Sequence, residues 1–370
     1  MSDTQNNPAT LQAELSVVRQ EIDAIDAELL QLLNRRAGCA KKVGEIKSRH
    51  GEAGFIYRPE REAQVLRRIQ DLNQGPLPTE SVTWFFREVM SACLSLEQPL
   101  GIAFLGPLGT FSESAATKHF GHAARLLPQA SIDEVFHEVE AGHADYAVAP
   151  VENSTEGAVG RTLDLLLTSS LKICGEVVVR IHQNLLTHAP SLDQVTKVYS
   201  HAQSLAQCHE WLNRNLPGVP RISVGSNAQA AQMAAQEPGA AAIAGEAAAE
   251  RYGLPRLAEC IEDEPNNTTR FVVMGRHDAG ASGGRDKTSL IMSSPNQTGA
   301  LHTLLLPFAD AGVSMSRLES RPARHTLWEY VFFVDVEGHR EDPPVKAALE
   351  ELAKRAAYLK ILGSYPVAVY

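Results

Sequence analysis

Three basic residues near the N-terminus have the types and spacing to bind an acidic small molecule. Arg36 and Lys47 lie eleven residues apart in a stretch that reads as one helix, so at about 100° per residue their side chains point within about 20° of each other. Arg19 points about 100° away from Arg36 and would reach the same pocket only from a partner chain. Cations facing into a small helical bundle are costly unless an anion meets them. The spacing indicates an anion pocket, although each cation alone is equally consistent with a solvated surface charge.

A second set of polar residues follows short apolar runs in the middle of the chain. The runs end in small or polar turns, as in GIAFL/GPLGTFS, YAVAPV/ENSTEG and VTKVYS/HAQS. This alternation predicts strands that lead into helices. A helix N-terminus offers free backbone N–H groups and a dipole that favour anions. Several such ends at one cleft would suit a small di-acid.

The N-terminal cations need a helical support. From Pro8 to about His50, apolar residues recur at intervals of three and four with no interior proline, which predicts one helix about 60 Å long. Two further helices are expected over 60–72 and 79–96. Three helices in under 100 residues make too little core for a monomer with a protruding arm, so we expect an interlocked helical dimer.

The rest of the chain predicts two further domains. An alternating α/β pattern begins after Glu97 and ends before HDAGASGGRD (277–286), whose composition is typical of a flexible linker. The order βαββαβ follows, with one strand expected in TLWEYVFFVDVE, and it predicts a helix-backed antiparallel sheet. The expected domains are therefore 1–98, 99–276 and 287–370, joined by the linker.

Composition excludes several classes of protein. The 370 residues carry 34 basic and 44 acidic side chains, a net charge of −10, which is the wrong sign for a nucleic-acid partner. No export signal and no run of about 20 apolar residues occurs, so we expect a cytoplasmic protein without a membrane partner. The five cysteines form no CxxC pair, and neither a disulfide framework nor a metal site is expected.

The N-terminal region resembles the all-helical chorismate mutase family, in VRQEIDAIDAELLQLLNRRAGCAKKVGEIK followed by YRPERE. The resemblance implies rearrangement of chorismate to prephenate, with charge on the breaking ether oxygen stabilised by the enzyme. It implies that the carboxylates are held by Arg36 and the partner's Arg19, that Lys47 and Glu97 donate to the ether oxygen, and that Glu62 binds the ring hydroxyl. The other matching positions are Arg58, Arg61 and Cys93. Glu97 stands where others carry Gln and would have to be protonated to donate, and Arg58 stands where some relatives carry an acid.

The middle region resembles the prephenate dehydratase family, in GPLGTFS, PVENSTEGAV, SHAQSLAQC and NNTTRF. The resemblance implies two α/β lobes like a type 2 solute-binding protein, with a cleft where prephenate loses CO2 and water without a cofactor or metal. Thr269 would donate a hydrogen bond to the departing hydroxyl, and Asn153 and Gln203 would orient the substrate. His201 is either the proton source or a helix-start histidine bonded to the backbone. Further substrate contacts are expected at Thr110, Ser112, Glu152, Ser154 and Arg270.

The last 85 or so residues resemble an ACT regulatory domain that binds phenylalanine. The matching motifs are GALH (Gly299, Ala300, Leu301, His302) and ESRP (Glu319, Ser320, Arg321, Pro322). A glycine before a helix lets the backbone approach a ligand, and the helix end suits its carboxylate.

Together the three regions resemble the bifunctional chorismate mutase/prephenate dehydratase family of phenylalanine biosynthesis. The resemblance implies feedback inhibition by L-phenylalanine and a homodimer, or a tetramer made of two dimers. Two alternatives remain open from the sequence. A bilobed cleft with an ACT unit can simply sense an amino acid, and an arogenate dehydratase would differ only in substrate.

Overall fold

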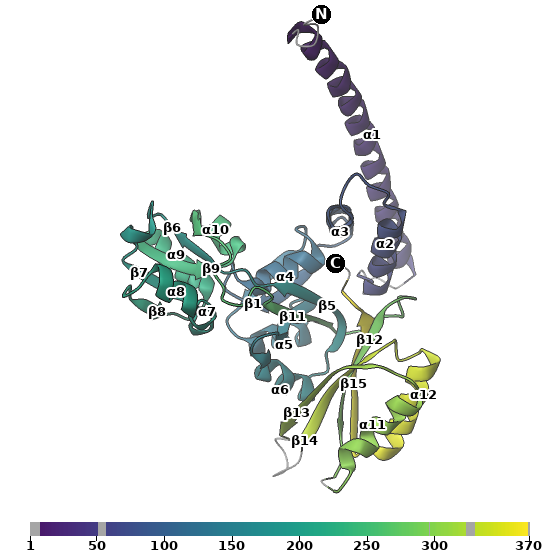
Figure 1. Ribbon diagram of the computed structural model, residues 1–370. Helices are drawn as coiled ribbons and strands as arrows, with labels where there is room; N and C mark the ends of the chain where they lie inside the picture. Colours follow the sequence, from purple (N-terminus) through teal and green to yellow (C-terminus); the bar gives the residue numbers. More distant parts are fainter. Residues whose placement is uncertain (1–7, 51–56, 296, 323–329, 369–370) are drawn as a thin grey trace, which may run out of the picture.

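The computed structural model describes residues 8–50, 57–295, 297–322 and 330–368, with side chains from residue 11 onward. The chain forms a helical N-terminal part, a bilobed α/β part and a C-terminal sheet covered by helices (Figure 1). This order confirms the multidomain architecture expected from the sequence. No described helix is both long and apolar enough to cross a membrane.

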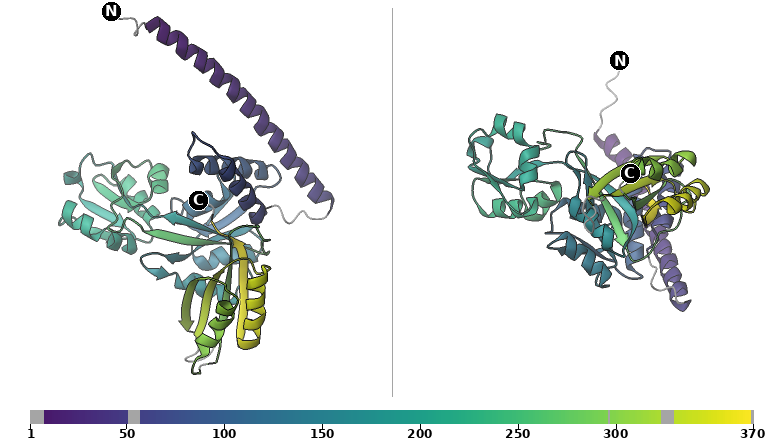
Figure 2. Two further views of the ribbon diagram at one scale, coloured as in Figure 1. Left: turned by 45° about the vertical axis from the view of Figure 1, so that its right-hand side comes forward. Right: turned by 90° about the horizontal axis from the view of Figure 1, so that it is seen from below.

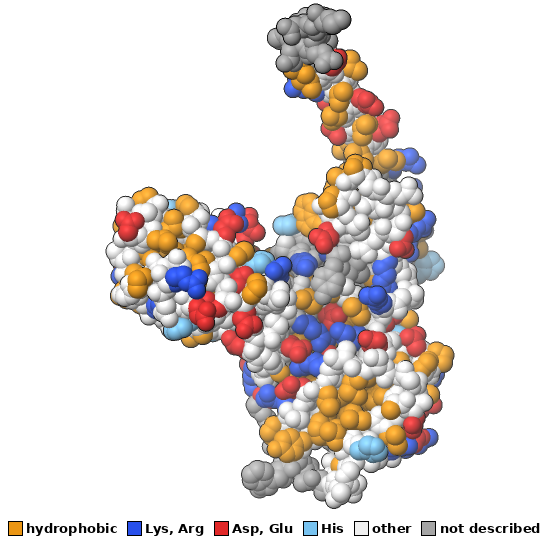
Figure 3. Space-filling view, in the orientation of Figure 1, with side chains coloured by type: hydrophobic (Ala, Val, Ile, Leu, Met, Phe, Trp, Pro, Cys, Tyr) orange, Lys and Arg blue, Asp and Glu red, His pale blue; other side chains and the backbone are white. Residues whose placement is uncertain are grey.

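The N-terminal part contains one long helix and two short ones. They are α1 (Pro8–Arg49), α2 (Pro59–Leu72) and α3 (Thr79–Ser95). Most of α1 extends away from the rest of the chain (Figure 2), and apolar side chains lie exposed along it (Figure 3). The exposed residues include Leu15, Val18, Ile22, Ile25, Leu29 and Leu32. A face of this size needs a second surface to cover it.

The bilobed part consists of two separate sheets with helices around them. The first lobe has the strand order β2-β1-β3-β11-β5, with β4 beside β3. Its elements are β1 (Gly101–Leu105), α4 (Phe111–Phe120), β2 (Arg125–Gln129), α5 (Ile132–Glu140), β3 (Tyr146–Asn153), β4 (Gly157–Ala158), α6 (Gly160–Thr168), β5 (Lys172–Arg180) and β11 (Thr268–Gly275). Strand β3 lies inside the sheet, where neighbouring strands and helices cover it. Its largely apolar sequence is the one expected for such a central strand.

The second lobe has the strand order β10-β6-β9-β7-β8. Its elements are β6 (Asn184–Thr187), η1 (Leu192–Gln194), β7 (Lys197–Ser200), α7 (Ala202–Gln207), α8 (His209–Asn215), β8 (Arg221–Ser223), α9 (Asn227–Gln236), β9 (Ala240–Ala244), α10 (Glu246–Tyr252) and β10 (Arg256–Ala258). Two segments connect the lobes: residues 181–183 lead out of the first lobe, and residues 259–267 return to it. The predicted pair of α/β lobes is confirmed.

The C-terminal part has the predicted order βαββαβ. Its elements are β12 (Asp286–Ser293), α11 (Ala300–Asp310), β13 (Met315–Pro322), β14 (Tyr330–Glu337), α12 (Pro343–Arg355) and β15 (Tyr358–Pro366), in the sheet order β13-β14-β12-β15. The strand expected in TLWEYVFFVDVE corresponds to β14. The first four residues of that segment, 326–329, lie outside the described residues.

The segment 277–286, expected to be a flexible linker, is instead held by packing and hydrogen bonds. Ala279 and Ser282 are buried. The Ser282 hydroxyl donates to Asp286 at 2.6 Å and accepts from Arg67 of α2 at 2.8 Å. Arg67 also donates to the Arg285 carbonyl at 2.7 Å. The prediction of a flexible linker was wrong because Ser282 forms hydrogen bonds and Gly284 lies against the Arg67 side chain.

Candidate active sites

Thr269 and Asn153 lie opposite each other on β11 and β3. The Asn153 side-chain amide donates to Thr269 Oγ1 at 2.9 Å. Because Oγ1 accepts this bond, the hydroxyl proton of Thr269 can point toward a ligand. Thr269 is half-buried, so a substrate can reach it. The arrangement provides a positioned hydrogen-bond donor.

Asn153 is itself fixed by four further hydrogen bonds. Its Oδ1 accepts from Thr155 N–H, from the Thr155 hydroxyl and from Glu156 N–H, at 3.0, 2.6 and 3.1 Å. Its amide also donates to Asn267 Oδ1 at 2.9 Å. Such a network orients Asn153 before a substrate binds.

Asn267 is a site residue that the sequence reasoning missed. It is 1% exposed, and its Nδ2 has no hydrogen-bond partner among the described residues. A buried amide donor without a partner is costly, and this one lies beside Thr269 in the same network. The only signal in the sequence was its place in NNTTRF.

The second lobe contributes the SHAQS segment. The backbone N–H of Gln203 donates to His201 Nδ1 at 3.3 Å, so His201 caps α7, as one of its two expected roles required. Asn227, which the sequence analysis did not single out, accepts from the Ser200 hydroxyl at 3.0 Å and from His201 N–H at 3.1 Å. Gln203 is half-buried. No described contact joins these residues to Thr269.

The lobes meet at the N-terminus of α4. Thr110 caps this helix by accepting from Glu113 N–H, and Ser112 is buried within it. A Cβ added to Gly245 would lie 2.8 Å from the Phe111 ring, so the approach of the two lobes requires glycine there. Arg251 of α10 also pairs with Glu113 at 3.5 Å.

Glu152 and Arg270 face the opposite side of the sheet from Asn153 and Thr269, since neighbouring residues of a strand alternate. Arg270 donates to Glu176 at 2.8 Å, to Asp335 at 2.5 Å and to Tyr365 at 2.9 Å. Glu152 pairs with Arg317 at 3.2 Å. We therefore correct their expected role: both contact the C-terminal sheet rather than the cleft.

Ser154 also has a structural role in this arrangement. Its hydroxyl accepts from Thr268 N–H at 2.9 Å and donates to the Asn266 carbonyl at 3.5 Å. Ser154 thus fastens the end of β3 to the start of β11. Its expected contact with substrate stays a prediction.

The N-terminal cations lie on α1, and Glu97 reaches the same helix from the end of α3. A Cβ added to Gly44 would lie 2.8 Å from Glu97 Cγ, so Glu97 packs on α1 one turn before Lys47. Arg36 and Lys47 are half-buried, whereas Arg19 is exposed. At 1.5 Å per residue, Arg19 lies about 25 Å along the helix from Arg36. One chain therefore brings Lys47 and Glu97 together but does not bring Arg19 to them.

Glu62 faces a different pocket from the one expected. It pairs with Arg87 at 3.5 Å and lines a pocket between α2, α4 and β5, to which no described residue of α1 contributes. Burial raises the pKa of Glu62 against the opposing effect of Arg87. The expected contact of Glu62 with a ligand held by Arg36 and Lys47 is thus not formed in this chain. Thr269 does not line this pocket.

The remaining residues of the N-terminal set are spread over α2 and α3. Arg61 is exposed, Arg58 pairs weakly with Glu60 at 3.8 Å, and Cys93 is buried in α3. Cys93 stands one turn before Glu97, so both can face the same region of α1.

The two C-terminal motifs lie at one end of the β12–β15 sheet. Ser293, at the end of β12, pairs with Val331, which pairs with Arg321 on β13. Gly299, with φ of 77°, precedes α11, which comes directly after β12 along the chain. The GALH motif therefore lies at the same end of the sheet as Ser293. His302, Ser320 and Pro322 are exposed, while Ala300, Leu301 and Glu319 are half-buried. Arg321, expected to bind phenylalanine, instead donates to Asp164 of α6 at 3.1 Å, so its expected role is corrected to an interdomain contact.

Comparisons with known proteins divide the chain in the same way. The family profile for chorismate mutase type II matches residues 18–98, prephenate dehydratase matches 102–279, and the ACT domain matches 288–354. A bifunctional chorismate mutase/prephenate dehydratase from Neisseria gonorrhoeae is 59% identical over 95% of this chain and 96% of its own. The chain belongs to the bifunctional chorismate mutase/prephenate dehydratase family.

Two solved structures are similar to about three quarters of this chain. A prephenate dehydratase from Arthrobacter aurescens in complex with L-Phe is 36% identical, with a TM-score of 0.67 over 72% of this chain and 90% of its own. A protein described as a quorum quenching acylase is 33% identical, with a TM-score of 0.66 over 72% of this chain and 98% of its own. As a member of the bifunctional family, this chain carries the two catalytic domains of phenylalanine biosynthesis.

Proposed function

We propose that Thr269 is the hydrogen-bond donor that helps the hydroxyl of prephenate depart. The observation that carries this proposal is the 2.9 Å bond from Asn153 to Thr269 Oγ1, because it leaves the threonine proton free for the substrate. As the C–CO2 bond and the C–OH bond break, the ring becomes aromatic, and the departing oxygen gains charge that the donor stabilises. The unpartnered Asn267 Nδ2 supplies a second donor to the substrate.

Thr269→Ser and Thr269→Val test this role. The serine retains a hydroxyl, so it should retain most dehydratase turnover, whereas the isosteric valine should lose about 10²- to 10³-fold in kcat. The measurement is phenylpyruvate formation from prephenate by ultraviolet absorbance. Equal rates for valine and wild type would refute the proposal.

We infer that the mutase site is shared between two chains. Its supports are the exposed apolar face of α1 and the distance that separates Arg19 from Arg36 along that helix. In a twofold dimer, Arg36, Lys47 and Glu97 of one chain would meet Arg19 of the partner subunit. Arg36 and the partner's Arg19 would hold the carboxylates of chorismate, and Lys47 and protonated Glu97 would donate to its ether oxygen.

Mixed dimers test the shared site directly. Arg19→Ala and Arg36→Ala homodimers should both be inactive as mutases. After the two are unfolded together and refolded, half of the dimers should be mixed, and each of these has one intact site. About a quarter of wild-type activity should return. No recovery, with mixed dimers shown by mass spectrometry, would contradict a shared site.

We further propose that L-phenylalanine binds at GALH and ESRP and inhibits the dehydratase. The supports are the ACT match, the L-Phe complex of the Arthrobacter aurescens relative and the exposed side chains of His302 and Ser320. The contacts of Arg270 with Asp335 and Tyr365 connect the ACT sheet to the strand that carries Thr269. His302→Ala should raise the phenylalanine concentration for half-inhibition without changing the uninhibited rate.

We also propose that the chain works in the cytoplasm as a dimer or as a tetramer made of two dimers. The five cysteines are free, as in a reducing compartment. Arogenate remains a possible second substrate of the cleft, and comparing kcat/KM for prephenate and arogenate measures the preference.

A further inference from the structure

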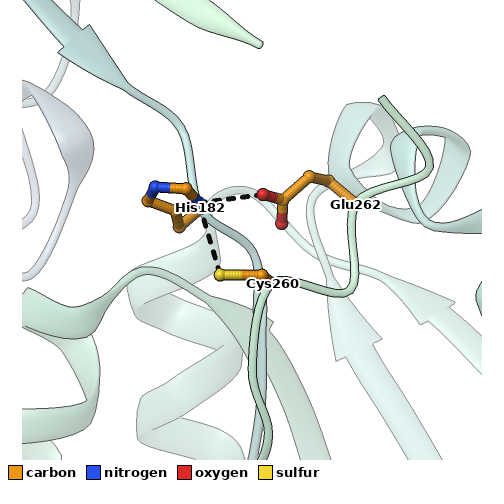
Figure 4. A group of neighbouring side chains, drawn as sticks. All are labelled: His182, Cys260 and Glu262. Carbon is orange, nitrogen blue, oxygen red and sulfur yellow. Dashed lines mark hydrogen bonds and ion pairs between the residues drawn. The ribbon is translucent and has the colours of Figure 1, made fainter. Parts of the chain in front are cut away.

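His182, Cys260 and Glu262 bring three different metal-ligand atoms together at the connection between the two dehydratase lobes (Figure 4). His182 Nδ1, Cys260 Sγ and a Glu262 carboxylate oxygen lie within 4.8 Å of one another. His182 belongs to the outgoing segment, and the other two belong to the returning one. We propose that this cluster binds a divalent transition metal of the Zn²⁺ class.

The distances are close to those of a tetrahedral chelate. Cys260 Sγ lies 3.5 Å from His182 Nδ1, and Glu262 Oε1 lies 2.9 Å from the same nitrogen. With Zn–S near 2.3 Å and Zn–N and Zn–O near 2.1 Å, tetrahedral angles place S and N about 3.6 Å apart and N and O about 3.4 Å apart. These two separations therefore differ from the tetrahedral values by about half an ångström or less.

The cluster does not have the geometry of a proton relay. In a thiol–imidazole–carboxylate relay, the thiol and the carboxylate contact different nitrogens of the ring. Here both approach His182 Nδ1, while the other ring nitrogen points away from them (Figure 4). Three potential metal-ligand atoms that lie this close together are arranged to bind one shared cation.

The surroundings orient each ligand, as they do around known metal sites. The Glu262 side chain is 3% exposed, and its Oε2 accepts from Gln183 N–H at 2.9 Å, so Oε1 remains available. Cys260 has a φ of 51°, and its N–H donates to Asn184 Oδ1 at 3.1 Å. Cys260 is exposed and the His182 side chain is 41% exposed, so a metal can enter and retain a water ligand.

The set of donor atoms selects the class of metal. A thiolate and an imidazole favour Zn²⁺ and Co²⁺, whereas Mg²⁺ and Ca²⁺ prefer oxygen ligands throughout. A bound metal would cross-link the two segments that join the lobes. Gln183, next to His182 in the outgoing segment, also donates to Ser204 of α7 at 3.0 Å. The restraint that the metal imposes on this segment would therefore extend to the helix that carries Gln203.

Cobalt titration of the full-length, reduced and EDTA-treated chain tests the site. We expect one Co²⁺ per chain, with thiolate-to-metal absorption in the near ultraviolet that Zn²⁺ displaces. Cys260→Ser should abolish this absorption, and the matched control Cys39→Ser, at the other exposed cysteine, should retain it. Absence of the absorption in wild type, or its survival in Cys260→Ser, would overturn the proposal.

A second variant keeps the test decisive if Cys260→Ser does not fold. His182→Gln changes a partly exposed side chain, and its fold is checked by circular dichroism. It should weaken Co²⁺ binding by more than about tenfold. Wild-type Co²⁺ affinity in the folded His182→Gln chain would exclude the site.

Discussion

In the proposed dehydratase mechanism, Thr269 acts through the direction of its hydroxyl proton, and the hydrogen bond from Asn153 sets that direction. An amide that donates to Oγ1 leaves the threonine to donate to substrate, whereas a carboxylate at the same position would accept the threonine proton. The residue pair therefore makes a sharp prediction, because Asn and Asp have nearly the same shape.

Asn153→Asp should lower dehydratase kcat by about 10²-fold or more, since Thr269 would donate to the carboxylate and the added charge would repel an acidic substrate. Steady-state kinetics with prephenate measure the effect. The matched control Asn213→Asp, on exposed α8, should be neutral. An Asn153→Asp enzyme with wild-type kcat would show that the hydrogen bond has no catalytic role.

Glu97 makes a second prediction at this scale. An ionised carboxylate only accepts hydrogen bonds and repels charge on the ether oxygen, so the proposed role requires a side chain here that can donate. Glu97→Gln supplies a permanent donor and should retain mutase turnover, whereas Glu97→Leu, which cannot donate, should lower it about 10²-fold. Dehydratase turnover should be unchanged in both variants. Equal mutase turnover in Glu97→Leu and wild type would remove Glu97 from the mechanism.

The sequence singled out Thr269, Asn153 and Glu97 as candidates because they stand in recognisable motifs, and their catalytic roles stay predictions. It misassigned Arg270 and Glu152 because a motif does not show that alternate residues of a strand face opposite sides. It gave no sign of the metal site proposed above, because His182 and Cys260 are 78 residues apart and no local spacing links them.

Two elements from different domains make their closest approach where β15 meets β5. A Cβ on Gly363 would lie 2.0 Å from the Ile173 carbonyl oxygen, and backbone atoms cannot move aside as a flexible side chain can. Only glycine allows this contact between the ACT sheet and the dehydratase.

Gly363→Ala should therefore separate the ACT sheet from β5. We expect faster proteolysis between residues 277 and 286 and weaker inhibition by phenylalanine. The control Gly38→Ala, which has no atom within 4 Å of its added Cβ, should leave both unchanged. A Gly363→Ala chain with wild-type proteolysis and inhibition would show that this contact does not couple the domains.

The docking of the N-terminal part on the first lobe includes a half-buried histidine of α4, His119. Burial lowers the pKa of His119 to about 3, and its Nε2 lies 3.0 Å from the Tyr57 hydroxyl. The imidazole of His119 takes up a proton near pH 6.5 in the unfolded chain but only near pH 3 in the folded chain. The contribution of His119 to the free energy of unfolding is therefore fully present above pH 6.5 and is lost as the pH drops toward 3.

Between pH 8 and pH 5 this difference amounts to about 2 kcal/mol of unfolding free energy. His119→Gln cannot take up the proton, so it should lose that much less stability than wild type over the same range. Urea denaturation at the two pH values measures the difference. Parallel losses in both proteins would show that His119 is not the titrating group.

The sequence predicted the helices and strands well because their apolar periods are long and regular. It failed for the segment 277–286, whose glycine and serine composition gave no sign of the bond from Arg67 to Ser282. Contacts between residues over 200 positions apart cannot be read from local composition.

At the scale of the whole molecule, a buried ionic cluster joins the dehydratase to the ACT sheet. Glu176, whose side chain is 3% exposed, accepts from Arg270 and from Lys287. Burial alone would raise the pKa of Asp335, but Arg270 and Ser289 outweigh it and hold that pKa below its ordinary value. The link therefore remains charged near neutral pH. The long helix α1, in contrast, leaves its apolar side chains exposed.

The central claim is that one chain carries two chemically independent sites, one on α1 and α3 and the other at β3 and β11. The most direct test measures both activities in Arg36→Ala and in Thr269→Val, each as a folded protein. The account predicts that Arg36→Ala loses mutase activity and retains dehydratase activity, and that Thr269→Val does the reverse. Loss of both activities in either folded variant would contradict it.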